Sequence, residues 1–100
     1  MHGQPMDRLL HLPGADLVQR GIADLRAGRE SPEALLVAVG EPRLRRIGID
    51  LPAVAVDQPE HRLYLLLAAA DSATAHSRYN ALIRRLVSFE RAAECVGSST

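Results

Sequence analysis

The sequence predicts an all-α protein that folds as a compact bundle of about five helices. Only 3% of its residues are aromatic, so the core must be aliphatic, which suits packed helices better than sheets. Residues typical of helix starts and ends recur along the chain, and the apolar residues between them follow the period of an α-helix. A chain of 100 residues forms one domain, which we place at residues 13–96. We expect the flanking segments, 1–12 and 97–100, to be a flexible N-terminal arm and a frayed C-terminus.

The first helix is expected to follow Gly14. Val18, Ile22 and Leu25 recur there at the spacing of one helix face, so they should point into the core. Gly28 is typical of the position directly after a helix, so we expect this helix to end there.

Two short helices are predicted next, at 32–39 and 42–47. Ser31 can accept a hydrogen bond from the free backbone N–H groups of a first helical turn. Gly40 and Pro42 are expected to separate the two helices, because glycine is common after a helix end and proline at the first helical position.

The second half of the chain is predicted to form a helical hairpin. Residues 49–56 contain alternating apolar side chains, but no second strand candidate exists to pair with them, so we expect an extended connection. The helix at 59–70 is apolar nearly all round in its second half, which is typical of a central helix. The last and longest helix, at about 73–95, should pack back against it.

The last helix carries a polar residue inside its apolar face. That face covers an arc of about 160°, wider than the roughly 100° of a surface helix, so the helix should touch at least two neighbours. Glu90 projects into the middle of the arc, and a buried carboxylate needs a partner, for which an arginine of another helix is suitable. The buried polar candidates are therefore His76, Asn80 and Glu90.

The opposite side of the same helix is a candidate interface. Small side chains recur there, which allows a second helix to approach closely, although such residues also occur on faces that contact only solvent. Arginines flank them and could form the polar rim of an interface, where arginine is enriched. The interface candidates are Ser77, Ala81, Arg84, Arg85, Ser88 and Ala92.

The composition excludes several kinds of chemistry. Every basic residue is arginine, so the chain has no lysine for a Schiff base or for a phosphate-binding P-loop. The single cysteine, Cys95, cannot form an internal disulfide or a cysteine-based zinc site. The four histidines show no pairing at helical spacing, so we predict no metal site and no cofactor.

The chain shows no signal for a membrane. Its start lacks the apolar region of a signal peptide, and its longest apolar run, residues 63–70, is shorter than the ~20 residues that span a bilayer. We therefore expect a cytoplasmic protein without a membrane partner.

No catalytic set converges in the sequence. His76 and Glu90 could act as base and acid, but on one helix they lie about four turns, or ~20 Å, apart. The leading hypothesis is a small non-enzymatic interaction or regulatory protein that acts as a homodimer or as a partner subunit of another protein. A hydrolase or ligand-binding protein that uses His76, Tyr79 and Glu90 stays open as a further class.

The alternative to an interaction protein is a nucleic-acid-binding regulator. Residues 33–49 have the order of a helix-turn-helix, with a glycine in the turn. Arg43, Arg45 and Arg46 lie on its second helix and could contact bases or phosphates of DNA or RNA. The formal net charge of zero argues against such a function, because binding to nucleic acid depends on neutralising phosphates.

Overall fold

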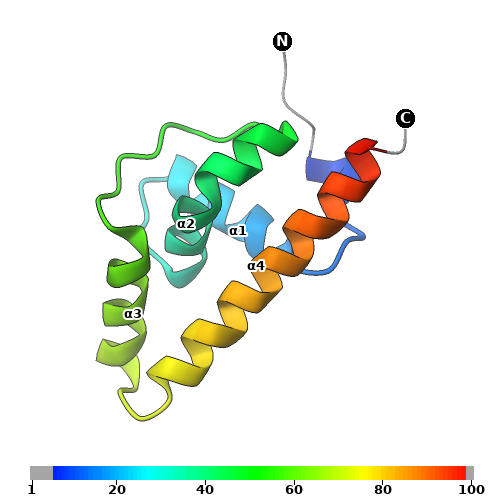
Figure 1. Cartoon of the computed structure of the whole chain (residues 1–100). Helices are drawn as coiled ribbons and strands as arrows, with labels where there is room; N and C mark the ends of the chain where they lie inside the picture. Colours follow the sequence, from blue (N-terminus) through cyan, green and yellow to red (C-terminus); the bar gives the residue numbers. More distant parts are fainter. Residues whose placement is uncertain (1–5, 99–100) are drawn as a thin grey trace.

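The computed structural model describes residues 6–98 of the chain. Within this range the chain forms one turn of 3-10 helix and four α-helices: η1 (Met6–Leu9), α1 (Ala15–Arg26), α2 (Pro32–Ile47), α3 (Pro59–Ala70) and α4 (Ala75–Ser98). The described residues contain no strand, so the predicted all-α class is confirmed, with four α-helices in place of five (Figure 1).

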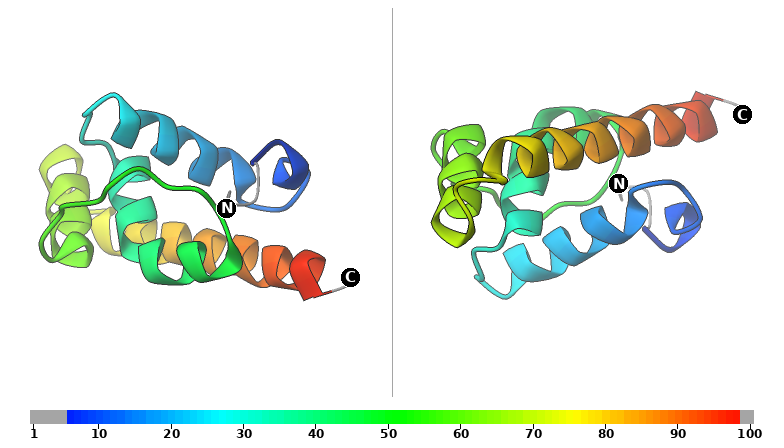
Figure 2. Two further views of the ribbon diagram at one scale, coloured as in Figure 1. Left: turned by 90° about the horizontal axis from the view of Figure 1, so that it is seen from above. Right: turned by 90° about the horizontal axis from the view of Figure 1, so that it is seen from below.

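α2 is the central helix of the bundle, because it packs against α1, α3 and α4. α4 is the longest helix and extends along one side of the molecule, which measures 44 × 24 × 19 Å (Figure 2). α3 and α4 are consecutive and packed, as predicted for a hairpin. The two helices meet at their connection and then diverge, so the hairpin is open (Figure 1).

α2 replaces the two short helices that were predicted at 32–39 and 42–47, and that prediction is wrong. The helix continues through Gly40 and Pro42 and changes direction near its middle, as the left view of Figure 2 shows. Proline removes one backbone donor and crowds the preceding turn, which bends a helix. The residues on both sides of Pro42 stay helical, so the helix bends without ending.

The outer ends of α2 agree with the sequence signals. The Ser31 hydroxyl accepts a hydrogen bond from the backbone N–H of Ala34 at 3.0 Å, and Pro32 occupies the first helical position. Gly48 ends the helix, and its N–H donates to the carbonyl of Arg45. Local capping chemistry therefore determined where the helix begins and ends.

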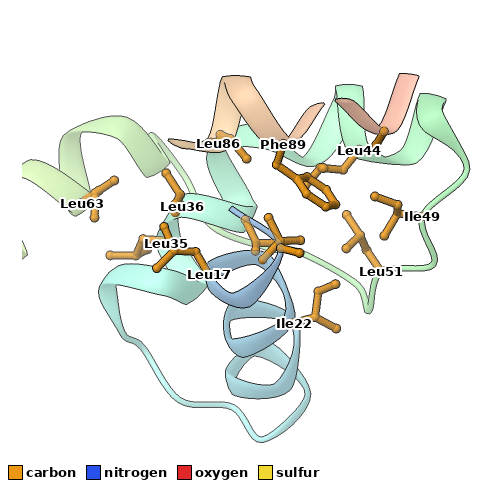
Figure 3. Close-up of a cluster of buried hydrophobic side chains, with 14 of the residues drawn as sticks. Leu17, Ile22, Leu35, Leu36, Leu44, Ile49, Leu51, Leu63, Leu86 and Phe89 are labelled. Carbon is orange, nitrogen blue, oxygen red and sulfur yellow. The ribbon is translucent and has the colours of Figure 1, made fainter. Parts of the chain in front are cut away.

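The core is aliphatic around one aromatic ring. Phe89 of α4 is fully buried beside Leu44 of α2, with Ile49 and Leu51 next to it (Figure 3). Ile49 and Leu51 anchor the connection that follows α2, and burial of each such side chain contributes roughly 1.5–3 kcal/mol. Residues 50–56 form neither helix nor strand, which agrees with the predicted extended connection.

α3 lies at one end of the molecule, so its predicted central place is wrong (Figure 1). Leu63 and Leu67 are buried, but Leu65 is 53% exposed and Tyr64 36% exposed. The Tyr64 ring packs edge-on against that of Tyr79 on α4, with ring centroids 5.9 Å apart. An apolar sequence alone therefore did not bring α3 to the centre, since α2 already occupies that place.

Part of the predicted N-terminal arm packs on the bundle. Leu9 at the end of η1 is 1% exposed and belongs to the core, whereas Leu10 is 43% exposed. Residues 1–5 lie outside the described residues. At the other end, α4 continues to Ser98, and residues 99–100 lie outside the described range.

Candidate interaction site

Glu90 is buried between α4 and α2, as its place in the apolar arc predicted. It is 3% exposed and is the only buried charged residue in the described part of the chain. Its Oε1 accepts a hydrogen bond from Nη1 of Arg43 at 3.3 Å. The same guanidinium donates from Nε and Nη2 to the two carboxylate oxygens of Glu94, at 2.9 and 2.7 Å. One arginine of α2 therefore holds two successive carboxylates of α4.

The electrostatics of this cluster differ between its two acids. Burial raises the pKa of Glu90 above its ordinary value, and the charge of Arg43 offsets this only in part. The hydrogen bond from Arg43 lowers the pKa of Glu94, which is exposed. No buried side-chain nitrogen or oxygen among the described residues lacks a hydrogen-bond partner. The cluster therefore joins α2 to α4 and is structurally satisfied.

The other two residues predicted to be buried and polar are not fully buried. His76 is exposed, and Asn80 is half-buried, so that prediction is wrong for His76. The two side chains contact each other, with Nε2 of His76 3.2 Å from Nδ2 of Asn80. His76 and Glu90 lie on one continuous helix, which separates them by about 21 Å along the axis, so the two do not meet.

A groove runs beside α4, along the starts of α1 and α2. Its larger part has a volume of about 400 Å³ and is lined by Pro13, Gly14, Ala81, Arg84, Arg85 and Ser88. Its smaller part, of about 240 Å³, is lined by Pro32, Glu33, Arg78, Ala81, Leu82 and Arg85. Ala81 and Arg85 line both parts, so we treat them as one feature, the α4 groove.

Four of the six interface candidates line the α4 groove. These are Ala81, Arg84, Arg85 and Ser88. Ser77 is exposed and Ala92 half-buried on the same helix, and neither lines the groove.

The opposite wall of the groove comes from the starts of α1 and α2, which no local sequence pattern connects with the interface. Gly14 is the residue that makes it possible, because a Cβ atom there would lie 2.6 Å from the backbone oxygen of Arg85. The start of α1 therefore approaches the backbone of α4 more closely than any other residue type would allow. Across this contact, Nη2 of Arg85 donates to Oδ1 of Asp16 at 3.1 Å. In the sequence, the one indication of this close approach is Gly14, a glycine directly before the expected first helix.

The walls of the groove are mainly positive. Arg78 and Arg84 form no ion pair with any described residue, and Arg85 pairs with Asp16. The one acidic residue in the lining is Glu33, which lies 3.7 Å from a guanidinium nitrogen of Arg20 outside the groove. Between the arginines the lining is formed by small and apolar side chains.

The segment considered for nucleic-acid binding has a different structure from the one predicted. Because α2 is continuous, the turn of a helix-turn-helix is missing from residues 33–49. Arg43 is engaged by the two acids of α4, and Arg45 donates to Glu41 at 2.6 Å and to the carbonyl of Pro52 at 2.8 Å. Arg46 is exposed and forms no ion pair with the described residues. Nucleic-acid binding by these arginines stays a prediction.

Comparisons of the chain with protein-family models, with curated proteins and with solved structures found no match. Within residues 6–98, no helix is both long enough and apolar enough to cross a membrane. The same residues contain no group of three or more side chains of the types that hold a metal ion. The function is therefore inferred from the α4 groove.

Proposed function

We propose that this chain is a small non-enzymatic interaction or regulatory protein that binds another protein chain in the α4 groove. The bound chain is a second copy, which would make a homodimer, or a separate partner. The observation that carries the proposal is that four residues expected at an interface, chosen for their place on one helix face, line a groove formed with two other helices.

The chemistry of the groove suits a protein partner. Interfaces commonly combine a core of apolar contacts with a rim that is enriched in arginine. Here Ala81 and Leu82 lie between Arg78, Arg84 and Arg85. Small side chains at the centre let a partner approach the backbone of α4, and the long arginine side chains can close over its edges.

The same lining gives little support to an enzyme. A serine nucleophile needs a base within hydrogen-bond reach, and Ser88 is the one hydroxyl in the lining. No histidine lines either part of the groove. His76 has Asn80 as its neighbour, and it lies too far along α4 from Glu90 for joint catalysis.

The proposal is tested by filling the groove with one side chain. Ala81→Trp places an indole in the stretch that is common to both parts, and Ala23→Trp on α1, an exposed position outside the groove, is the matched control. Circular dichroism first checks that both variants are folded. We then measure sedimentation of the purified chains, together with capture of proteins from an extract of the source cells.

We expect the wild type and Ala23→Trp to self-associate or to capture the same protein, and Ala81→Trp to lose that interaction. If the folded Ala81→Trp variant associates and captures as the wild type does, the groove is not the interaction site. If the wild type stays monomeric and captures nothing, the proposed function is wrong.

A further inference from the structure

We infer that the α4 groove binds an acidic segment of a partner protein, one that carries carboxylates on both sides of small apolar side chains. This inference rests on the proposed function and adds the chemistry of the partner.

The positive charge of the groove is not balanced within the protein. Three arginines line the groove, and two of them, Arg78 and Arg84, have no ion-pair partner among the described residues. Arg85 lies seven positions after Arg78, which places their backbones about 10 Å apart along α4. Guanidinium groups recognise carboxylates by charge-assisted hydrogen bonds. A segment with carboxylates about 10 Å apart can therefore meet both ends of the groove.

Asp16 occupies the place that a carboxylate of the partner would take. It accepts a hydrogen bond from Arg85 at 3.1 Å, and the side chains of this pair are 50% and 59% exposed. An ion pair that is so exposed is weak, so an incoming carboxylate can replace Asp16 at Arg85. Removing the Asp16 charge should therefore strengthen binding of an acidic segment.

The lining favours a peptide over a nucleic acid. Pro13, Pro32 and Leu82 offer apolar contact between the arginines, and the two parts of about 400 and 240 Å³ are large enough for apolar side chains. Glu33 in the lining and Asp16 beside it interrupt the positive charge, so the groove lacks the continuous basic surface that a row of phosphates needs. The formal net charge of zero likewise gives little of the long-range attraction on which nucleic-acid binding depends.

The test is a selection of random peptides of about twelve residues on the purified full-length chain, a length that exceeds the span of about 10 Å along the groove even when the peptide is helical. The wild type is compared with Arg78→Glu/Arg84→Glu. The matched control is Arg8→Glu/Arg26→Glu, which changes the charge equally at two exposed positions outside the groove. The selected peptides are then labelled, and their affinities are measured by fluorescence anisotropy, with circular dichroism as the check of folding.

We expect the selected peptides to be enriched in aspartate and glutamate. Arg78→Glu/Arg84→Glu should weaken their binding at least about tenfold, whereas the control should change it by less than about twofold. Asp16→Asn should strengthen it about two- to fivefold, because Arg85 is then free. Raising the salt concentration should weaken binding by the wild type.

Four results would overturn the inference. Peptides without acidic enrichment that still depend on the groove would show the wrong partner chemistry, while the proposed function would stand. Failure to select any peptide, or equal binding by the groove variant, would overturn the inference, while the proposed function would still be decided by the Ala81→Trp comparison. A single-stranded oligonucleotide of similar length that binds as tightly, and that depends equally on Arg78 and Arg84, would assign the groove to nucleic acid.

Discussion

A methyl group added at Gly40 of α2 would lie 2.9 Å from Oε2 of Glu90 on α4. The buried carboxylate therefore occupies the space that a side chain at position 40 would fill. Arg43, three residues further along α2, reaches the other carboxylate oxygen at 3.3 Å. The absent side chain and the arginine together let α4 bury a charged residue against α2.

Gly40→Ala should destabilise the protein even though alanine favours a helix. The contact with Glu90 and with two methyl groups of Leu86 at 3.1 Å would cost about 1–3 kcal/mol, against a gain of roughly 1 kcal/mol from helix propensity. Urea denaturation measures the difference. The loss should be smaller when Glu90→Ala is also present, and an equal loss in both backgrounds would mean that Glu90 is not the neighbour that matters.

Arg43→Ala should destabilise the protein more than Arg46→Ala, although both residues are arginines of α2. Removal of Arg43 leaves Glu90 buried without the arginine that hydrogen-bonds to it, which is the costly way to break a buried pair. Arg46 is exposed, and its removal should change the free energy of unfolding by no more than about 0.5 kcal/mol. Glu90→Leu added to Arg43→Ala should recover part of the loss. Equal effects of the two single variants would contradict the described cluster.

Glu90→Gln should change how stability depends on pH. Because burial raises the pKa of Glu90 above its ordinary value, the folded protein keeps this proton to a higher pH than the unfolded chain does. The contribution of Glu90 to stability therefore falls as the pH rises from its pKa in the unfolded chain to its pKa in the folded protein. Glutamine does not titrate, so the variant lacks this fall. The free energy of unfolding of the variant, relative to the wild type, should increase from about pH 4 to pH 7.

Glu94 affects the pH dependence of stability in the opposite direction. Its pKa is lowered, so its contribution is present at neutral pH and is lost as the pH falls. Glu94 is present in both proteins, so it largely cancels in their difference. Urea denaturation at several pH values measures that difference, and a value that stays constant or decreases with pH would show that burial does not raise the pKa of Glu90.

Gly14→Ala should be more damaging than Gly28→Ala. Both glycines have a positive φ, of 80° and 72°, and in that conformation a side chain costs about 1–2 kcal/mol. A Cβ atom at position 28 would meet nothing within 4 Å, whereas one at position 14 would press on the backbone oxygen of Arg85. We therefore expect a total loss of about 2–4 kcal/mol for Gly14→Ala. Thermal and urea denaturation of the two variants measure how much more stability Gly14→Ala loses than Gly28→Ala.

The candidate site was predictable only on the side that belongs to α4. The helical period places Ala81, Arg85 and Ser88 on one face, and small residues on a face are a signal of close approach. The starts of α1 and α2, which complete the groove, are more than 40 residues away in the sequence. No local pattern indicates which helix end will meet which face.

Local sequence patterns likewise did not show which arginine would contact Glu90. The position of Glu90 in the apolar arc indicated that an arginine of another helix would be needed, and Arg43 is that arginine. The sequence did not distinguish it from Arg45 and Arg46, so all three were considered as contacts to nucleic acid. The distinction depends on how α2 and α4 cross, which brings together residues 47 positions apart.

By itself, the sequence determined the all-α class, the cap at Ser31, the end of α2 at Gly48 and the burial of Glu90. These features depend on hydrogen bonds and side-chain periods within a few residues, so nearby residues are enough to specify them. Only the tertiary structure decided that α2 continues through Pro42, that α3 lies at the end of the bundle, and that a groove forms beside α4. Those outcomes depend on which apolar faces cover one another, a competition among distant segments that no single stretch of sequence contains.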